Sequence, residues 1–215
     1  MNTKLLLFAG LAAGLVWELC PTAMAQTNTY TIGSGTLNEI IPDNDLDGLA
    51  STINVNVPMN DITNVQVTLD LTGYPNANDA YNGDYYAYVQ YSSGLIVLLN
   101  RLDATVSNPY GSAGSGFNVT FSDSAPNIGT APVIAGQPLT GTWAPQEGSL
   151  STFDGMNPNG AWTFFIADES PGGVCMLQDW SVELTGVPEP STLALLGLAA
   201  VTLIAYAGRR RNAKA

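Results

Sequence analysis

Apolar and polar residues alternate one by one along much of this 215-residue chain. The clearest run is 65–71, where valine or leucine fills every second position and Gln66, Thr68 and Asp70 lie between them. A period of two is typical of a strand with one buried face. The same pattern predicts further strands at 53–57, 85–91, 95–99, 117–121, 162–167 and 180–184.

Stretches rich in glycine, asparagine and proline separate these runs and predict turns. No stretch between the two ends of the chain shows a helical period. Many short strands with such connections favour an all-β fold, a single-domain β-sandwich or jelly roll. Trp143, Trp162 and Trp180 lie in or beside apolar strands, so we expect all three to be buried in the core.

Residues 1–25 have the organisation of a signal peptide. Lys4 supplies a positive start and residues 5–16 form an apolar stretch. Ala23 and Ala25 form an A-x-A cleavage site immediately before Gln26. The sequence therefore predicts export, with cleavage after Ala25.

The other end of the chain has a different pattern. An apolar run covers 192–207, near the lower limit for a transmembrane helix, and arginines occupy 209–211. The arginines would hold this end on the cytoplasmic side. A short motif that disfavours helix precedes the run, because each proline restricts its own φ and the residue before it. Its residues are Val187, Pro188, Glu189 and Pro190.

This order of motif, apolar span and basic end resembles the PEP-CTERM sorting signal of Gram-negative bacteria, here over 188–215. The resemblance implies processing by an exosortase, a membrane protease-transpeptidase. It also implies an inner-membrane intermediate held by the C-terminal transmembrane helix, then delivery to the cell surface or the extracellular matrix. An ordinary single-pass anchor that is never cut is the alternative interpretation.

Acids dominate the charge of the chain, whose net charge is −12. Between 26 and 187 one basic residue, Arg101, faces sixteen acids, which are the 18 of the chain less Glu18 and Glu189. The net charge of this part is therefore −15. Such a domain repels nucleic acid, which we exclude as a partner, and favours cations or weakly charged partners. Cys175 is its single cysteine, which excludes an intrachain disulfide.

Residues 41–184 resemble a known module. The similarity lies in the opening residues 41–44, in the strand 160–168 around Trp162, and in the segment 177–184 around Trp180. In order and spacing these segments resemble the P domain, or Homo B domain, of subtilisin-like proprotein convertases. The resemblance implies a β jelly roll over 26–187, here without the catalytic domain that it normally follows.

The residues that most hydrolases use are missing. The chain contains no histidine, so neither a Ser-His-Asp nor a Cys-His arrangement can be built. Zinc sites of the His/Cys type are excluded for the same reason. Close carboxylate pairs arise by chance among sixteen acids and do not by themselves indicate a glycosidase. We therefore expect a protein that is not an enzyme.

Carboxylates before the first central strand indicate calcium as a possible ligand. Asp43, Asp45 and Asp47 alternate before Gly48, and Ca²⁺ prefers oxygen ligands around a sharp turn. Asn54 stands at the twelfth position, where an EF-hand has glutamate, so an EF-hand is not expected. A solvated acidic turn is the alternative. The P-domain resemblance adds further candidate ligands at strand ends: Asp84, Asp123 and Asp168.

Tyr86 and Tyr88 share one face of the strand 85–91. If this face is exposed, the pair forms a platform for sugar rings, whereas cross-strand packing is the alternative. Three functions remain open from the sequence. The first is a surface or matrix component that binds polysaccharide or envelope proteins, a carbohydrate-binding module included. The others are an accessory P domain that assists a separate subtilisin-like serine protease, and a carboxylate-dependent enzyme.

Overall fold

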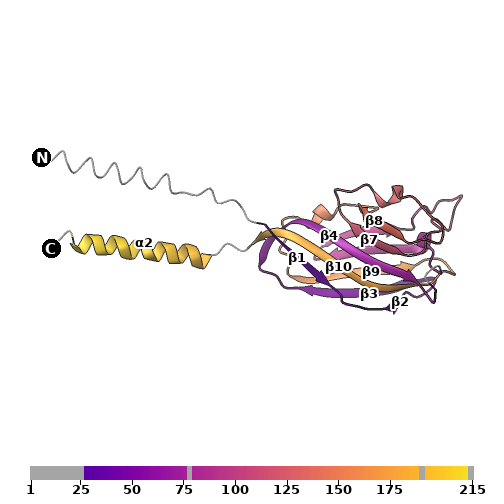
Figure 1. The fold of residues 1–215 in the computed structure, drawn as a ribbon, viewed down its shortest axis with the longest axis horizontal. Coiled ribbons are helices and arrows are strands. Elements are labelled where there is room, and N and C mark those ends of the chain that lie inside the picture. Colours follow the sequence, from indigo (N-terminus) through magenta and orange to yellow (C-terminus); the bar gives the residue numbers. More distant parts are fainter. Residues whose placement is uncertain (1–26, 77–78, 189–191, 213–215) are drawn as a thin grey trace.

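The computed structural model describes residues 27–76, 79–188 and 192–212. The described residues form two facing β-sheets and a C-terminal helix, as Figure 1 shows. This confirms the predicted β class with two sheets. The jelly-roll topology and the relationship to P domains remain predictions.

The larger sheet has the strand order β1-β10-β4-β7-β8, and the short β2 also pairs with β10. Neighbouring strands are antiparallel except β7 and β8, which are parallel. Strand β4 is the longest, with 15 residues. The bounds are β1 Asn28–Gly33, β2 Glu39–Ile40, β4 Met59–Gly73, β7 Phe117–Phe121, β8 Leu139–Trp143 and β10 Cys175–Pro188.

The smaller sheet has the order β3-β9-β5-β6 and is antiparallel throughout. Its strands are β3 Asp45–Val55, β5 Tyr85–Tyr91, β6 Gly94–Asn100 and β9 Gly160–Asp168. Three 3-10 turns lie between strands: η1 Asn82–Asp84, η2 Ile128–Thr130 and η3 Leu150–Phe153.

The core lies between the two sheets, where alternate residues of each strand point inward. Trp162 and Trp180 have no exposed surface, and the Trp180 ring lies 5.6 Å from that of Phe164. The prediction for Trp143 is wrong, because this side chain is only partly buried. It lies at the end of the edge strand β8, where its Nε1–H donates to the Thr140 carbonyl.

All predicted runs lie within strands except 53–57, which extends past the end of β3 at Val55. That strand instead begins early, at Asp45, where a bulge before Leu49 interrupts the alternation. Strands β1, β2 and β8 were not predicted. They are short or partly exposed edge segments, so burial leaves a weaker pattern in their sequences.

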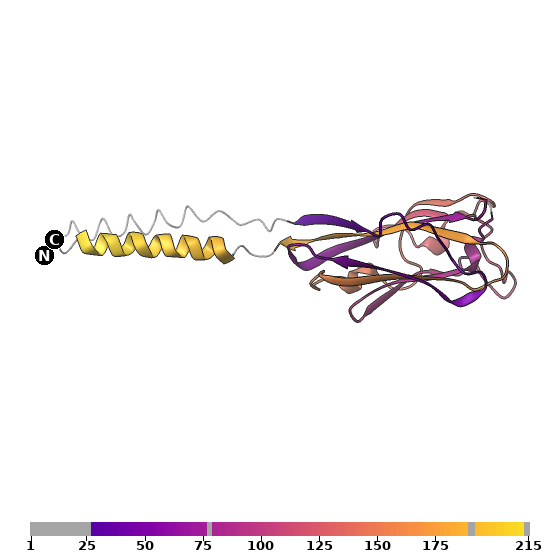
Figure 2. The same cartoon turned by 90° about the horizontal axis from the view of Figure 1, so that it is seen from below.

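The strands run lengthwise between two ends of the sandwich (Figure 2). At the end that we call the terminal pole, Asn28 of β1 pairs with Gly186 of β10, and Pro188 pairs with Met59. At the opposite end, the distal pole, Gly73 of β4 pairs with Cys175. Strand β4 runs from one pole to the other, a length of about 50 Å at 3.3 Å per residue.

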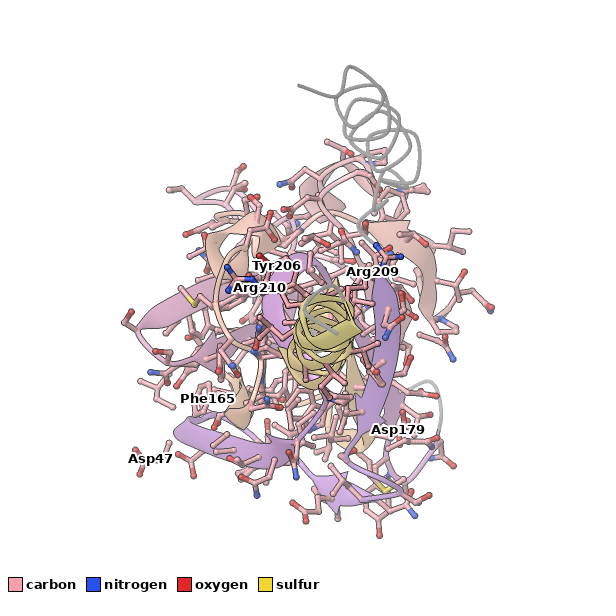
Figure 3. The ribbon with its side chains drawn as sticks, turned by 90° about the vertical axis from the view of Figure 1, so that its left-hand side faces the viewer. Asp47, Phe165, Asp179, Tyr206, Arg209 and Arg210 are labelled. Carbon is pink, nitrogen blue, oxygen red and sulfur yellow. The ribbon has the colours of Figure 1, made fainter. Side chains whose placement is uncertain are left out.

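The C-terminal helix α2, Thr192–Asn212, extends away from the terminal pole (Figure 2). Arg209 and Arg210 lie at its far end, and the Arg210 guanidinium lies 5.8 Å from the centre of the Tyr206 ring (Figure 3). Within the described residues, no helix has the length and apolar character that a membrane span requires. The predicted transmembrane helix is therefore not supported. Helix α2 extends through the arginines at 209–211, so only its first sixteen residues are mainly apolar. These sixteen residues span about 24 Å, which is less than the roughly 30 Å thickness of a hydrocarbon core.

Candidate functional site

Acidic residues from three chain segments meet at the distal pole. Asp168 ends β9 and pairs with Tyr85 at the start of β5 and with Asp45 at the start of β3. Because β9 lies between these two strands, the residues that precede them are brought to the same end of the sheet. Those residues include Asp84 and Asp43.

Asp84 and Asp168 are buried, with 3% and 0% of their surface exposed. Asp168 Oδ1 accepts a hydrogen bond from the Ser170 backbone N–H at 3.1 Å. The other oxygen of Asp168, Oδ2, and the Oδ1 of Asp84 are buried and have no hydrogen-bond partner among the described residues. Buried polar atoms are nearly always paired, so two unpaired carboxylate oxygens at one pole require an explanation.

The charged forms of both carboxyls are disfavoured. Burial raises the pKa of Asp168 to about 7, and the neighbouring carboxylates of Asp84 and Asp43 add to the effect. Burial also raises the pKa of Asp84 to about 6, although a hydrogen bond from Ser170 and the charge of Arg101 oppose the rise. The distal pole thus concentrates negative charge where water cannot screen it well.

Arg101, the basic residue of the domain, does not neutralise this charge by direct pairing. Its Nη2 donates to the Pro109 carbonyl at 2.7 Å and to Ser170 Oγ at 2.8 Å. Its Nε donates to the Gly83 carbonyl at 3.3 Å. These three acceptors are neutral oxygens, so Arg101 joins loops at the pole while the carboxylates keep their free oxygens.

A hollow of about 240 Å³ adjoins Asp84 at the surface. Tyr81 and Tyr110 line it, Asp84 contributes to its wall, and Pro171 and Gly172 complete it. The Gly172 N–H donates to Asp43 Oδ1 at 2.9 Å, which ties the turn before β3 to this rim. The hollow is large enough for several water molecules.

The other predicted metal ligands lie at different distances from the buried pair, and Asp45 is the cross-strand partner of Asp168. Asp45 Oδ1 accepts the backbone N–H of Asp47 at 2.9 Å, and Asp47 is exposed near the periphery of the domain (Figure 3). No three acidic or cysteine side chains of the described segments converge closely enough to hold a metal together. Strand register thus brings Asp84 and Asp168 together, with Asp43 and Asp45 nearby. Exposed Asp47 lies outside this group, and Asp123 lies elsewhere in the fold.

Asp123 has a separate role near the terminal pole. It accepts hydrogen bonds from Ser149 Oγ at 2.5 Å and from the backbone N–H groups of Leu150 and Ser151 at 2.8 Å each. Burial tends to raise the pKa of Asp123, but these hydrogen bonds outweigh it and hold the pKa below its usual value. Asp123 therefore holds the start of η3 in place.

Tyr86 and Tyr88 lie on the outer face of the smaller sheet and are partly buried. Tyr88 stacks on Phe165 of β9, with ring centres 4.9 Å apart and planes 18° from parallel. Tyr86 meets Tyr88 edge-on at 6.2 Å. Phe165 was not predicted to join these tyrosines, although its position between buried Phe164 and Ile166 predicts an outward direction.

The predicted sorting motif begins within β10 of the larger sheet. Val187 and Pro188 are the last residues of β10, where they pair with Asp61 and Met59 of β4. Glu189 and Pro190 lie outside the described residues, as do the predicted signal cleavage residues Ala23, Ala25 and Gln26. No flexible linker therefore separates the folded domain from the start of the predicted motif.

Comparison with known proteins identifies this segment. Residues 186–211 match the family model described as the PEP-CTERM protein-sorting motif. The motif implies export and exosortase-dependent sorting to the surface of Gram-negative cells. No curated protein matches the chain.

Two solved structures are similar to most of the chain. The Aeromonas sobria serine protease in complex with its chaperone gives a TM-score of 0.45 at 14% identity, over 83% of this chain and 30% of that one. The serine protease of Aeromonas sobria gives a TM-score of 0.44 at 14% identity, over 81% and 29%. The chain thus spans less than a third of the length of these solved chains.

Proposed function

We propose that this chain is an exported, non-catalytic protein that an exosortase processes and delivers to the cell surface or the extracellular matrix. Its β domain, stabilised by calcium, binds or supports other envelope components there. The match of residues 186–211 to the sorting motif carries this proposal. The signal peptide expected over 1–25 supports it, because sorting requires prior export.

The position of the motif supports an orientation in which the terminal pole faces the attachment point. Strand β10 runs directly into the motif, and β1 starts beside the end of β10 at the terminal pole. Figure 1 shows helix α2 on this side of the sandwich. The distal pole would then face away from the attachment point by about the 50 Å length of β4.

The described chemistry supports a role without catalysis. Burial raises the pKa of Cys175 to about 12, so its thiol is not the nucleophilic thiolate at neutral pH. The chain also lacks the histidine that would activate a serine or a cysteine. The P-domain resemblance points the same way, because that domain accompanies a catalytic domain and does not perform the chemistry.

Mass spectrometry of the protein from cells tests the proposal. In exosortase-competent cells we expect a mass that lacks residues 1–25 and also lacks Arg209–Arg211. In cells without the exosortase the C-terminal helix should remain. A Glu189→Ala and Pro190→Ala double variant should be processed poorly, whereas Thr185→Ala, just before the motif, should be processed normally. A mature protein that keeps its arginines in competent cells would overturn the proposal.

Polysaccharide is the binding partner that one further observation favours. Tyr86, Tyr88 and Phe165 form a partly exposed aromatic strip across β5 and β9, and sugar rings stack on such surfaces. Retention on matrix polysaccharide should fall for Tyr88→Ala and stay unchanged for Leu95→Ala, an exposed apolar control on β6. Co-purification with a subtilisin-like protease in place of polysaccharide would favour the accessory P-domain role.

A further inference from the structure

Two carboxylate oxygens at the distal pole have no hydrogen-bond partner among the described residues, which raises the question of what binds there. Oδ1 of Asp84 and Oδ2 of Asp168 are buried, belong to neighbouring strand ends, and accept no hydrogen bond from the described residues. A buried carboxylate without a partner is strongly destabilising. Two of them near each other add repulsion to the cost of desolvation.

Four kinds of partner can satisfy such oxygens: a basic side chain, a proton, water or a metal cation. Arg101 directs its hydrogen bonds to Pro109, Ser170 and Gly83, so it leaves both oxygens free. A shared proton would neutralise one carboxyl and leave the other charged, and water would hydrogen-bond to both carboxylates without neutralising either. A divalent cation matches both charges at once and also attracts the nearby negative charge of Asp43.

We propose that Asp84 and Asp168 bind a calcium ion at the distal pole, with Asp43 adding negative charge beside it. The ligands are hard oxygens, which Ca²⁺ and Mg²⁺ both accept. Calcium fits better because it accepts an irregular set of six to eight oxygens, whereas magnesium demands a near-ideal octahedron. Water in the adjoining hollow beside Tyr81 and Tyr110 would complete the coordination.

The ion would add a side-chain link between three segments that meet at the distal pole. Asp84 precedes β5, Asp168 ends β9, and Asp43 is tied through its hydrogen bond with Gly172 to the loop after β9. Neutralising the carboxylates would hold these segments together and complete the rim of the hollow. This inference rests on the proposed calcium-stabilised domain and names where the ion binds.

Thermal unfolding and calorimetric titration of the purified full chain test the inference. After removal of metals with EDTA, millimolar Ca²⁺ should raise the Tm by at least about 5 °C, and Mg²⁺ should raise it less. The calorimeter should report about one bound Ca²⁺. An unchanged Tm together with no heat of binding would overturn the inference.

Asparagine variants separate the site from a general effect of salt. Asp84→Asn and Asp168→Asn should each weaken Ca²⁺ binding at least tenfold. In EDTA the same variants should unfold at a Tm equal to or above that of the wild type, because they remove an unpaired charge. Asp47→Asn is the matched control and should bind Ca²⁺ normally, because this exposed carboxylate lies in the predicted acidic loop but outside the buried pair.

The result also separates this inference from the sorting proposal. If both asparagine variants keep the full Ca²⁺ response, the ion binds elsewhere and the inference is wrong. The mass of the mature protein from cells reports sorting independently and should be the same for Asp84→Asn and the wild type. Normal processing with no Ca²⁺ binding would thus leave the sorting proposal intact and overturn this one.

Discussion

The two poles of the sandwich are stabilised in different ways. At the terminal pole, Trp162 stacks on Tyr91 with ring centres 4.3 Å apart, and Phe153 of η3 packs edge-on at 5.0 Å. At the distal pole, Asp84 and Asp168 are equally buried but keep unpaired oxygens. One end is held by apolar contacts, which need nothing from solution, and the other holds charge that needs a partner.

The carboxylates near the two poles also differ in the hydrogen bonds that they accept. Asp123, beside η3, accepts three hydrogen bonds from two backbone groups and a hydroxyl, and its pKa is lowered. The pKa values of Asp84 and Asp168 are raised, because burial there is not matched by hydrogen bonds. The donors that surround a carboxyl group therefore decide whether its charged form is stabilised, as for Asp123, or disfavoured, as for Asp84 and Asp168.

The largest predicted effect concerns the aromatic cluster of the terminal pole. Trp162→Ala should lower the free energy of unfolding by about 3–5 kcal/mol, because it leaves a cavity between Tyr91 and Phe153. Urea denaturation with and without Ca²⁺ measures this. The loss should be the same in both conditions, since the cluster contains no ion ligand. Trp143→Ala, at a partly buried edge position, is the control and should cost clearly less.

A smaller effect is expected at Asp123. Asp123→Ala should cost about 1–2 kcal/mol at pH 7, as the loss of a capping carboxylate does elsewhere. Because the folded pKa is lowered, the stabilisation is present above the unfolded pKa and is lost as the pH falls through the folded value. Urea denaturation of wild type and variant should therefore converge in acid, below about pH 3.9. A difference that stays constant as the pH falls well below about 3.9 would show that the carboxylate charge is not what stabilises η3.

The smallest predicted effect lies on the outer face of the smaller sheet, between the poles. Tyr88→Ala should lower the free energy of unfolding by about 0.5–1.5 kcal/mol, because it removes the stack on Phe165. Tyr88→Phe is the control and should keep the stack and nearly all of the stability. Thermal unfolding of both variants measures this, and equal Tm values would show that the stack contributes nothing to the fold.

The sequence predicted the strands that have two distinct faces. Runs such as 65–71 and 85–91 are flanked by paired strands and face the core on one side, so burial leaves a clear period of two. Strand β8 was missed because it is an edge strand whose middle residues are exposed. Trp143 was misjudged for the same reason, since the pattern does not show which strand stands at the edge.

The sequence predicted candidate metal ligands but not which of them lie close together in the fold. Spacing along the chain favoured Asp43, Asp45 and Asp47, because they are neighbours in sequence. In the structure Asp47 is exposed, and Asp84 and Asp168, which lie 84 positions apart in the numbering, meet because β5 and β9 pair. No local pattern reports that pairing.

By itself the sequence determined the β class and the sorting motif, because alternation and a contiguous motif are both local properties of the chain. The tertiary structure alone decided which acids meet. It also placed the motif at the end of β10, and it left two carboxylate oxygens buried without partners. Register and burial are set by contacts between segments far apart in sequence, and their physical consequences appear only once the sheets have formed.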